Sequence, residues 1–160
     1  MIFISILEYD KLIQLNDLKN ASIEGLETLY CEHTASPSPK GCFQGIFLQR
    51  LDKPGNRRPL YYGSKSFEFL PFGIDFNSCK WYFFHPLMRI AKFRTQCEAS
   101  RWRDSEVIKL HYDVSHLPSV IKRVLYDEIK PISHDLCLGL GGFNLEKDEG
   151  DQFYFALIRR

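Results

Sequence analysis

The stretch Val107-Ile-Lys-Leu-His-Tyr-Asp-Val114 decides the fold. Its apolar side chains, Ile108, Leu110 and Tyr112 among them, recur at every second position, and polar side chains separate them. Successive side chains of a β-strand point to opposite faces, so this period of two predicts a strand with one buried and one wet face. Tyr112 is expected to face inward, and His111 is expected to lie at the surface.

Other parts of the chain have the same strand character, and most of them follow residue 40. Aromatic residues, which favour strands and also line cavities, make up 14% of the sequence. Gly45 indicates a bulge, or a place where another group comes close to the backbone. We therefore expect a mainly β protein with an antiparallel sheet closed into a barrel, built from residues 41–51, 60–70, 81–90, 107–114, 136–143 and 152–158, with 91–100 as a strand or a short helix.

The part before the strands has a different pattern. Residues 8–32 have the apolar spacing of helices and predict two pieces, the second capped by Ser22. A loop with two prolines follows at residues 34–41. The length of 160 residues predicts a single domain, with an N-terminal helical segment and loop at 1–40 and a β-barrel at 41–160.

Residues 119–130 fit two different structures. As a strand, they direct Arg123 and Asp127 inward, roughly 13 Å apart, and leave Glu128 and Lys130 facing water. As a helix, they bring Arg123 and Asp127 close enough to pair, because residues four apart share a helix face. Both alternatives stay open at this point.

The composition argues against several classes of function. With 21 basic and 20 acidic residues the net charge is +1, so no nucleic-acid partner is expected. Five irregularly spaced cysteines predict reduced thiols and a cytoplasmic location, and the absence of metal-ligand spacing predicts no metal and no cofactor. Residues 1–7 are too short to span a membrane and form a poor signal peptide, so no membrane insertion is expected. They are expected to form a first strand or a packed terminal segment.

A series of short elements occurs in a familiar order: Gly41-Cys-Phe-Gln-Gly45, Tyr61-Tyr-Gly-Ser-Lys-Ser-Phe67, His85-Pro-Leu87, Tyr112-Asp113, Asp127, Leu138-Gly139 and Phe153-Tyr-Phe155. The series resembles the GXWXG family and the C-terminal domain of unknown function associated with it, with Phe43 in the place of the signature tryptophan. The resemblance covers residues 40–160. It implies a lipocalin-like (calycin-type) β-barrel, and the family has no settled activity to carry over.

A small closed barrel can hold one small ligand in an interior with apolar walls and a few polar groups. His85 and Asp127 are the candidate acid–base residues, because imidazole and carboxyl groups suit proton transfer. Each candidate also has an ordinary structural explanation, either aromatic packing or a charge that faces solvent. The candidates for ligand binding are Tyr62, Lys65, Phe83, Tyr112 and Arg123.

These features support three hypotheses about function. The first is binding of a small, mainly hydrophobic molecule, with a carboxylate or carbonyl end, in the lumen of the barrel. The alternative is an isomerase or cyclase of a hydrophobic metabolite that uses acid–base residues in the same lumen. The third is a protein-interaction module that uses the aromatic residues 81–84. The oligomeric state is left open.

Overall fold

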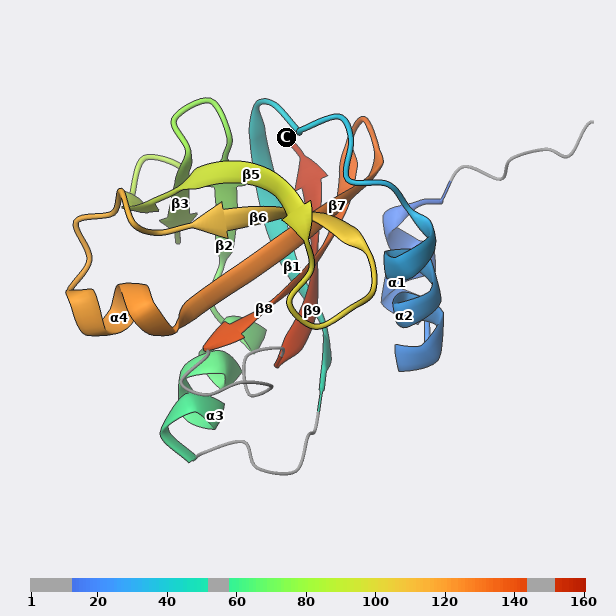
Figure 1. Ribbon diagram of the computed structural model, residues 1–160, viewed down its shortest axis with the longest axis horizontal. Helices are drawn as coiled ribbons and strands as arrows, with labels where there is room; N and C mark the ends of the chain where they lie inside the picture. Colours follow the sequence, from blue (N-terminus) through green and yellow to red (C-terminus); the bar gives the residue numbers. More distant parts are fainter. Residues whose placement is uncertain (1–12, 52–57, 144–151) are drawn as a thin grey trace, which may run out of the picture.

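The protein is a nearly closed antiparallel β-barrel with a few short helices (Figure 1), as expected from the sequence. The computed structural model describes residues 13–51, 58–143 and 152–160. Nine described strands form one sheet in the order β4-β3-β2-β1-β9-β8-β7-β6-β5. The narrower lipocalin-like description stays a prediction. The strands are β1 (Cys42–Arg50), β2 (Phe72–Asp75), β3 (Lys80–Phe83), β4 (Arg89–Lys92), β5 (Arg94–Ala99), β6 (Glu106–His111), β7 (Leu125–Ser133), β8 (Leu136–Phe143) and β9 (Phe153–Arg159).

The helices are all short. Those in the N-terminal part lie beside the barrel, and the others lie near its lower end in Figure 1. The helices are α1 (Leu15–Asn20), α2 (Ile23–Glu32), α3 (Arg58–Lys65), the 3-10 turn η1 (Ser66–Glu68) and α4 (Ser119–Val124).

The sheet curves round because its two outermost strands are consecutive in the chain. Only Phe93 separates β4 from β5. The first half of this stretch pairs with β3, and the second half pairs with β6. Phe93 is buried, and its N–H donates to the carbonyl of Cys79 (2.9 Å). A bend at one buried phenylalanine thus carries the sheet from one edge to the other.

Alternation along the strands creates two separate cores. In β9, Phe153 and Phe155 belong to the core inside the barrel. Tyr154 and Ala156, at the positions between, belong to a second core on the outer face, which includes Leu26 of α2. The N-terminal helices therefore cover one outer face of the barrel and do not enter its interior.

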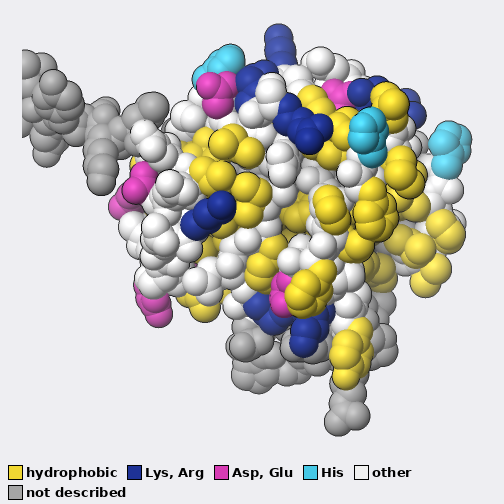
Figure 2. Space-filling model, turned by 180° about the vertical axis from the view of Figure 1, so that it is seen from behind, with side chains coloured by type: hydrophobic (Ala, Val, Ile, Leu, Met, Phe, Trp, Pro, Cys, Tyr) yellow, Lys and Arg dark blue, Asp and Glu magenta, His cyan; other side chains and the backbone are white. Residues whose placement is uncertain are grey.

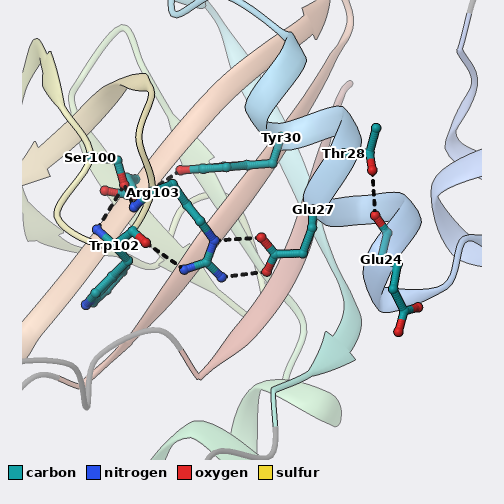
Figure 3. Close-up of polar contacts among 8 residues, drawn as sticks. Glu24, Glu27, Thr28, Tyr30, Ser100, Trp102 and Arg103 are labelled. Atoms are coloured by element: carbon teal, nitrogen blue, oxygen red, sulfur yellow. Dashed lines mark hydrogen bonds and ion pairs between the residues drawn. The ribbon is translucent and has the colours of Figure 1, made fainter.

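Helix α2 is fixed to the barrel by polar contacts as well as by this outer core. The cap predicted at Ser22 is confirmed, because its hydroxyl accepts the N–H of Gly25 (3.1 Å). Farther along the helix, Glu27 faces the guanidinium of Arg103 in two hydrogen bonds of 2.5 and 2.6 Å (Figure 3). Tyr30 points from the helix toward the sheet in the same view.

The expectation that Glu128 and Lys130 face water is wrong. Both side chains are 0% exposed, because α2 and the chain after it cover this face of β7. Glu128 accepts hydrogen bonds from Tyr30 (2.9 Å) and Ser100 (2.5 Å). Lys130 donates to the carbonyl of His33 (2.6 Å). Burial, which penalises the charged amine, lowers the pKa of Lys130.

Residues 60–70 form α3 and η1 and not the expected strand. Long-range contacts decide this segment. Arg50, at the end of β1, donates to the fully buried Ser64 (2.8 Å) and to Glu68 (2.8 Å), which holds both short helices against the barrel. The strand β2, between Pro71 and Phe76, had no clear signal in the sequence, because it is only four residues long and contains a glycine.

Residues 119–130 combine the two alternatives. Ser119–Val124 form α4, and β7 begins at Leu125, where pairing with Phe143 of β8 starts. Asp127 therefore faces inward, as the strand alternative predicts. Arg123 is on the helix and exposed, so the expectation that it points inward is wrong.

Two findings concern the expected location of the protein. In residues 13–51, 58–143 and 152–160, no helix is long and apolar enough to cross a membrane. All five cysteines are free thiols, as the sequence predicts. The segment expected at residues 1–7 lies outside the described part of the chain, and the cytoplasmic location stays a prediction.

Glycines in the barrel wall make room for interior rings. A Cβ at Gly45 would lie 2.0 Å from the ring of Phe72, and one at Gly139 would lie 2.2 Å from the ring of Phe155. We expect Gly139→Ala to lower the free energy of unfolding by about 1–3 kcal/mol, because the packed ring has to move. Urea unfolding measures this change.

The matched control is Gly25→Ala in α2. A Cβ there meets nothing closer than 3.5 Å, so alanine should raise the free energy of unfolding by up to about 1 kcal/mol. A loss of stability at Gly25, or none at Gly139, would contradict the packing described above.

Candidate functional site

Aromatic rings occupy the centre of the barrel. Phe67, which enters from η1, has ring centroids 5.4 Å from Phe72, 6.4 Å from Trp81, 6.0 Å from Phe83 and 5.2 Å from Phe153. These separations are typical of stacked and edge-to-face pairs. A ligand must therefore find space away from this cluster.

One chain of hydrogen bonds crosses the apolar interior. The indole N–H of Trp81 in β3 donates to the hydroxyl of Tyr112 (2.6 Å). That hydroxyl donates to Oδ2 of Asp127 in β7 (2.5 Å). Trp81, Tyr112 and Asp127 are 4%, 4% and 6% exposed. Burial first, and then the neighbouring carboxylate, raise the pKa of Tyr112 well above its usual 10.0, so its hydroxyl stays a donor.

Asp127 is the reactive member of this chain. Burial raises its pKa from 3.8 to about 7, against the lowering effect of the hydrogen bond from Tyr112. Near neutral pH the carboxyl group therefore exists in both protonation states and can accept or donate a proton. Gly141 of β8 makes room for it, since a Cβ there would lie 2.1 Å from Oδ1.

One carboxyl oxygen of Asp127 has no donor among the described residues. Tyr112 donates to Oδ2, and no described residue donates a hydrogen bond to Oδ1. Asp127 as a whole is only 6% exposed, so a polar group that reached Oδ1 would make its hydrogen bond largely away from water.

The barrel wall opens next to this group. The pairing of β6 with β7 runs from Ile108↔Ile129 to Leu110↔Asp127 and ends there, because the chain leaves β6 for α4 before it returns as β7. A hollow of about 530 Å³ lies between the separated strands and α4. Tyr112 and Leu125 line it and also belong to, or pack against, the interior core. The hollow thus reaches Tyr112, the middle member of the chain of hydrogen bonds, from the solvent side.

The rim of the hollow is mainly basic. Lys109 and His111 each contact Glu98 (2.9 and 3.0 Å). Lys122 and Arg123 of α4 have no ion-pair partner among the described residues. These two cations favour a ligand with a negative end. The full lining is Lys109, Leu110, His111, Tyr112, Asp113, Ser119, Lys122, Arg123, Leu125 and Tyr126.

The structure brings four of the predicted site residues to this region. Tyr112 and Asp127 are hydrogen bonded to each other, and Tyr112 faces inward while His111 lies outside, as predicted. Phe83 lies in the interior, with its ring 6.4 Å from that of Trp81. Arg123 lies at the rim of the hollow.

The other three predicted residues lie elsewhere. Tyr62 on α3 is 67% exposed, and His85 is exposed in the turn between β3 and β4, so the expectation that they line the interior is wrong. A helix and a tight turn replace the strands that would have directed them inward. Lys65 is half-buried at the end of α3. The functional roles predicted for these residues stay predictions.

Sequence reasoning missed Trp81 and Gly141 as members of the site. Trp81 was interpreted only as part of an aromatic surface, although a buried indole N–H needs an acceptor and so signals a polar partner inside the protein. Gly141 lies in a glycine-rich strand that gave no sign of the carboxyl group opposite. That pairing depends on the register of β7 with β8.

A second hollow, of about 600 Å³, lies between residues 33–40 and the end of β7. Arg159 lines this hollow, but its guanidinium already has hydrogen-bond partners. It donates to the carbonyls of Lys40 (2.6 Å) and His134 (3.0 Å) and to Asp135 (2.7 Å). These contacts join the chain end to two loops. They make a structural role the better explanation for this region.

The protein is a β-barrel with a chain of hydrogen bonds across its interior. Comparison with solved structures agrees on the fold. A crystal structure described as a protein from Thermomonospora curvata is similar, with a TM-score of 0.56 and 17% sequence identity over 88% of each chain. At this identity the likeness shows the fold alone. No family model matches the chain. No curated protein matches it either. The GXWXG resemblance stays a prediction.

The raised pKa of Asp127 predicts how stability changes with pH. Between about pH 4 and pH 7 the unfolded chain loses this proton while the folded protein keeps it, so folding becomes less favourable as the pH rises. One unit between two pKa values corresponds to about 1.4 kcal/mol, which gives up to roughly 4 kcal/mol over this range.

The measurement is the free energy of unfolding of the wild type minus that of Asp127→Asn, from pH 3.5 to 8.5. The difference should fall between about pH 4 and pH 7 and be flat outside that range. Other titrating groups are common to both proteins and cancel. A difference independent of pH would show that Asp127 titrates as an ordinary carboxylate.

Proposed function

We propose that the protein binds a small, mainly hydrophobic molecule with a carbonyl or carboxylate end. The molecule enters through the hollow between β6, β7 and α4, and its polar end meets Asp127. The observation that carries the proposal is a carboxyl group, 6% exposed, with one oxygen that receives no hydrogen bond from a described residue and with its partner Tyr112 on the wall of a hollow that opens to solvent.

Each part of the proposed ligand has a matching part of the site. Leu110, Leu125 and Tyr126 offer apolar contact along the hollow. Below its pKa of about 7, Asp127 carries a proton that it can donate to a carbonyl or carboxylate oxygen. Lys122 and Arg123, for which the described part of the chain offers no ion-pair partner, support an acidic end during entry, because opposite charges steer association.

Binding should depend on the proton of Asp127. We expect the affinity for decanoic acid and for 2-decanone, measured by isothermal titration calorimetry, to fall about tenfold for each pH unit above about 7. The fall should be steeper for the acid, because ionised Asp127 also repels a carboxylate.

Two variants make this test specific. Asp127→Asn keeps a donor at this position and should bind with little dependence on pH. The control is Glu24→Gln, which makes the same change from carboxyl to amide at an exposed position of α2 and should behave as the wild type. If the wild type binds with no dependence on pH, or if Asp127→Asn retains the wild-type profile, the ligand does not meet Asp127.

We also propose a second candidate, an isomerase that uses the same group. As a carboxylate, a group with a pKa of about 7 can remove a proton from the carbon next to a ligand carbonyl, which leaves a dienolate, and can return that proton to the far end of the dienolate. The proton taken from one carbon is given to another, so no further reactant is needed. Enclosure by the barrel wall would keep the proton from exchanging with solvent.

The probe for this reaction is 4-decen-2-one, a β,γ-unsaturated ketone whose conversion to the conjugated 3-decen-2-one is followed by its ultraviolet absorption. We expect the wild type to catalyse it, and Asp127→Asn to lose about 10²-fold or more in rate while still binding 2-decanone. Glu24→Gln again serves as the control. If the wild type binds 2-decanone but does not convert 4-decen-2-one, the isomerase proposal is wrong and the binding proposal is unaffected.

A further inference from the structure

We infer that the hairpin between β3 and β4 docks the protein on an anionic lipid surface. This inference concerns a different part of the molecule from the proposed ligand site and does not depend on it. It is a shallow contact through a hairpin tip and does not require a membrane-spanning segment, which the sequence does not predict.

The hairpin tip exposes large apolar side chains side by side. The hydrogen bond from Phe84 N–H to the carbonyl of Pro71 (2.8 Å) places the turn before β2 next to this tip. Exposed apolar residues that cluster in this way mark interaction sites, whereas isolated ones are common on any surface. The exposed fractions are 77% for Phe69, 62% for Phe84, 80% for Leu87, 55% for Met88 and 53% for Ile90.

The conformation of the tip adds to this argument. Phe84 has a φ of 64°, in the left-handed region that is costly for a phenylalanine. Its side chain is nevertheless exposed, so packing inside the protein does not compensate for the cost of this backbone conformation. Such strain together with exposure is typical of a functional surface.

The charges around the tip select the kind of partner. From residue 76 to residue 97 the sequence contains Lys80, Arg89, Lys92 and Arg94 and no acidic residue, although the net charge of the whole chain is only +1. Lys80 and Lys92 lie directly opposite each other in the β3–β4 pairing. Like charges in such a pair repel, and an anion between them would remove the repulsion.

The same cations line a place for an anionic group. A hollow of about 290 Å³ lies between the hairpin and residues 115–117, and Lys80, Arg89, Lys92 and His116 line it. Arg89 also bridges to Asp75 (3.2 Å), whereas Lys80 and Lys92 have no ion-pair partner among the described residues.

The spacing of the two features matches a membrane surface. Lys92 is four residues from Met88, or roughly 13 Å along the strand. Apolar surfaces of peripheral proteins enter about 5–10 Å into the boundary of headgroups and acyl chains, so the lysines would lie at the level of the phosphates. Figure 2 shows hydrophobic side chains over much of this rear face, including its right-hand part, and several cationic and histidine side chains near its upper edge.

The test is co-sedimentation of the full chain with sucrose-loaded vesicles, either of phosphatidylcholine alone or with about one third phosphatidylserine, a fraction that gives a strongly negative surface. We expect binding to the anionic vesicles only, weaker at higher salt. The double variant Phe84→Ser with Leu87→Ser should abolish it. Lys80→Gln and Lys92→Gln should each weaken it about fivefold.

The control is Val120→Ser on α4, which removes an equally exposed apolar side chain outside the hairpin (61% exposed) and should bind as the wild type. Thermal unfolding of each variant, followed by circular dichroism, checks that the fold is kept. Equal binding to both kinds of vesicle, no binding, or unchanged binding by the tip variants would overturn the inference. Self-association that the tip variants abolish, without vesicle binding, would assign the surface to a second copy of the chain.

Discussion

Strand β7 carries two adjacent carboxyl groups that are both withdrawn from water, Asp127 on its inner face and Glu128 on its outer face. A buried carboxyl group is stable only where other groups hydrogen bond to it, so each of them fixes its surroundings. Asp127 needs the hydroxyl of Tyr112, and Glu128 needs that of Tyr30, which holds α2 on the barrel. A shift of β7 by one residue would exchange the two faces and lose both sets of bonds.

The interior is therefore a packed aromatic core crossed by a chain of hydrogen bonds, and it is not an open ligand cavity. Phe67 and its neighbours occupy the centre, so a ligand cannot use the whole lumen. What remains is the opening where β6 and β7 separate, with the interior carboxyl group of Asp127 next to it. The separation of these strands, more than the barrel itself, carries the proposed function.

Much of the fold could be predicted from local patterns. The alternation around Tyr112 and along Phe153-Tyr-Phe155 gives strands with correct inner and outer faces, and the cap at Ser22 marks a real helix start. The errors fall where long-range packing outweighs local preference. The aromatic segment at residues 60–70 forms helices, because Arg50 holds it against the end of the barrel.

By itself, the sequence determined that the chain forms an antiparallel barrel with helices before it, and that Tyr112 faces inward, because the period of two is a local property of a strand. The tertiary structure alone decided that Asp127 lies on a strand and faces inward, that it meets Tyr112, that Trp81 joins them, and that Glu128 and Lys130 lie under a helix. These facts depend on strand order and register, which bring together residues far apart in the chain and leave no local periodicity in the sequence.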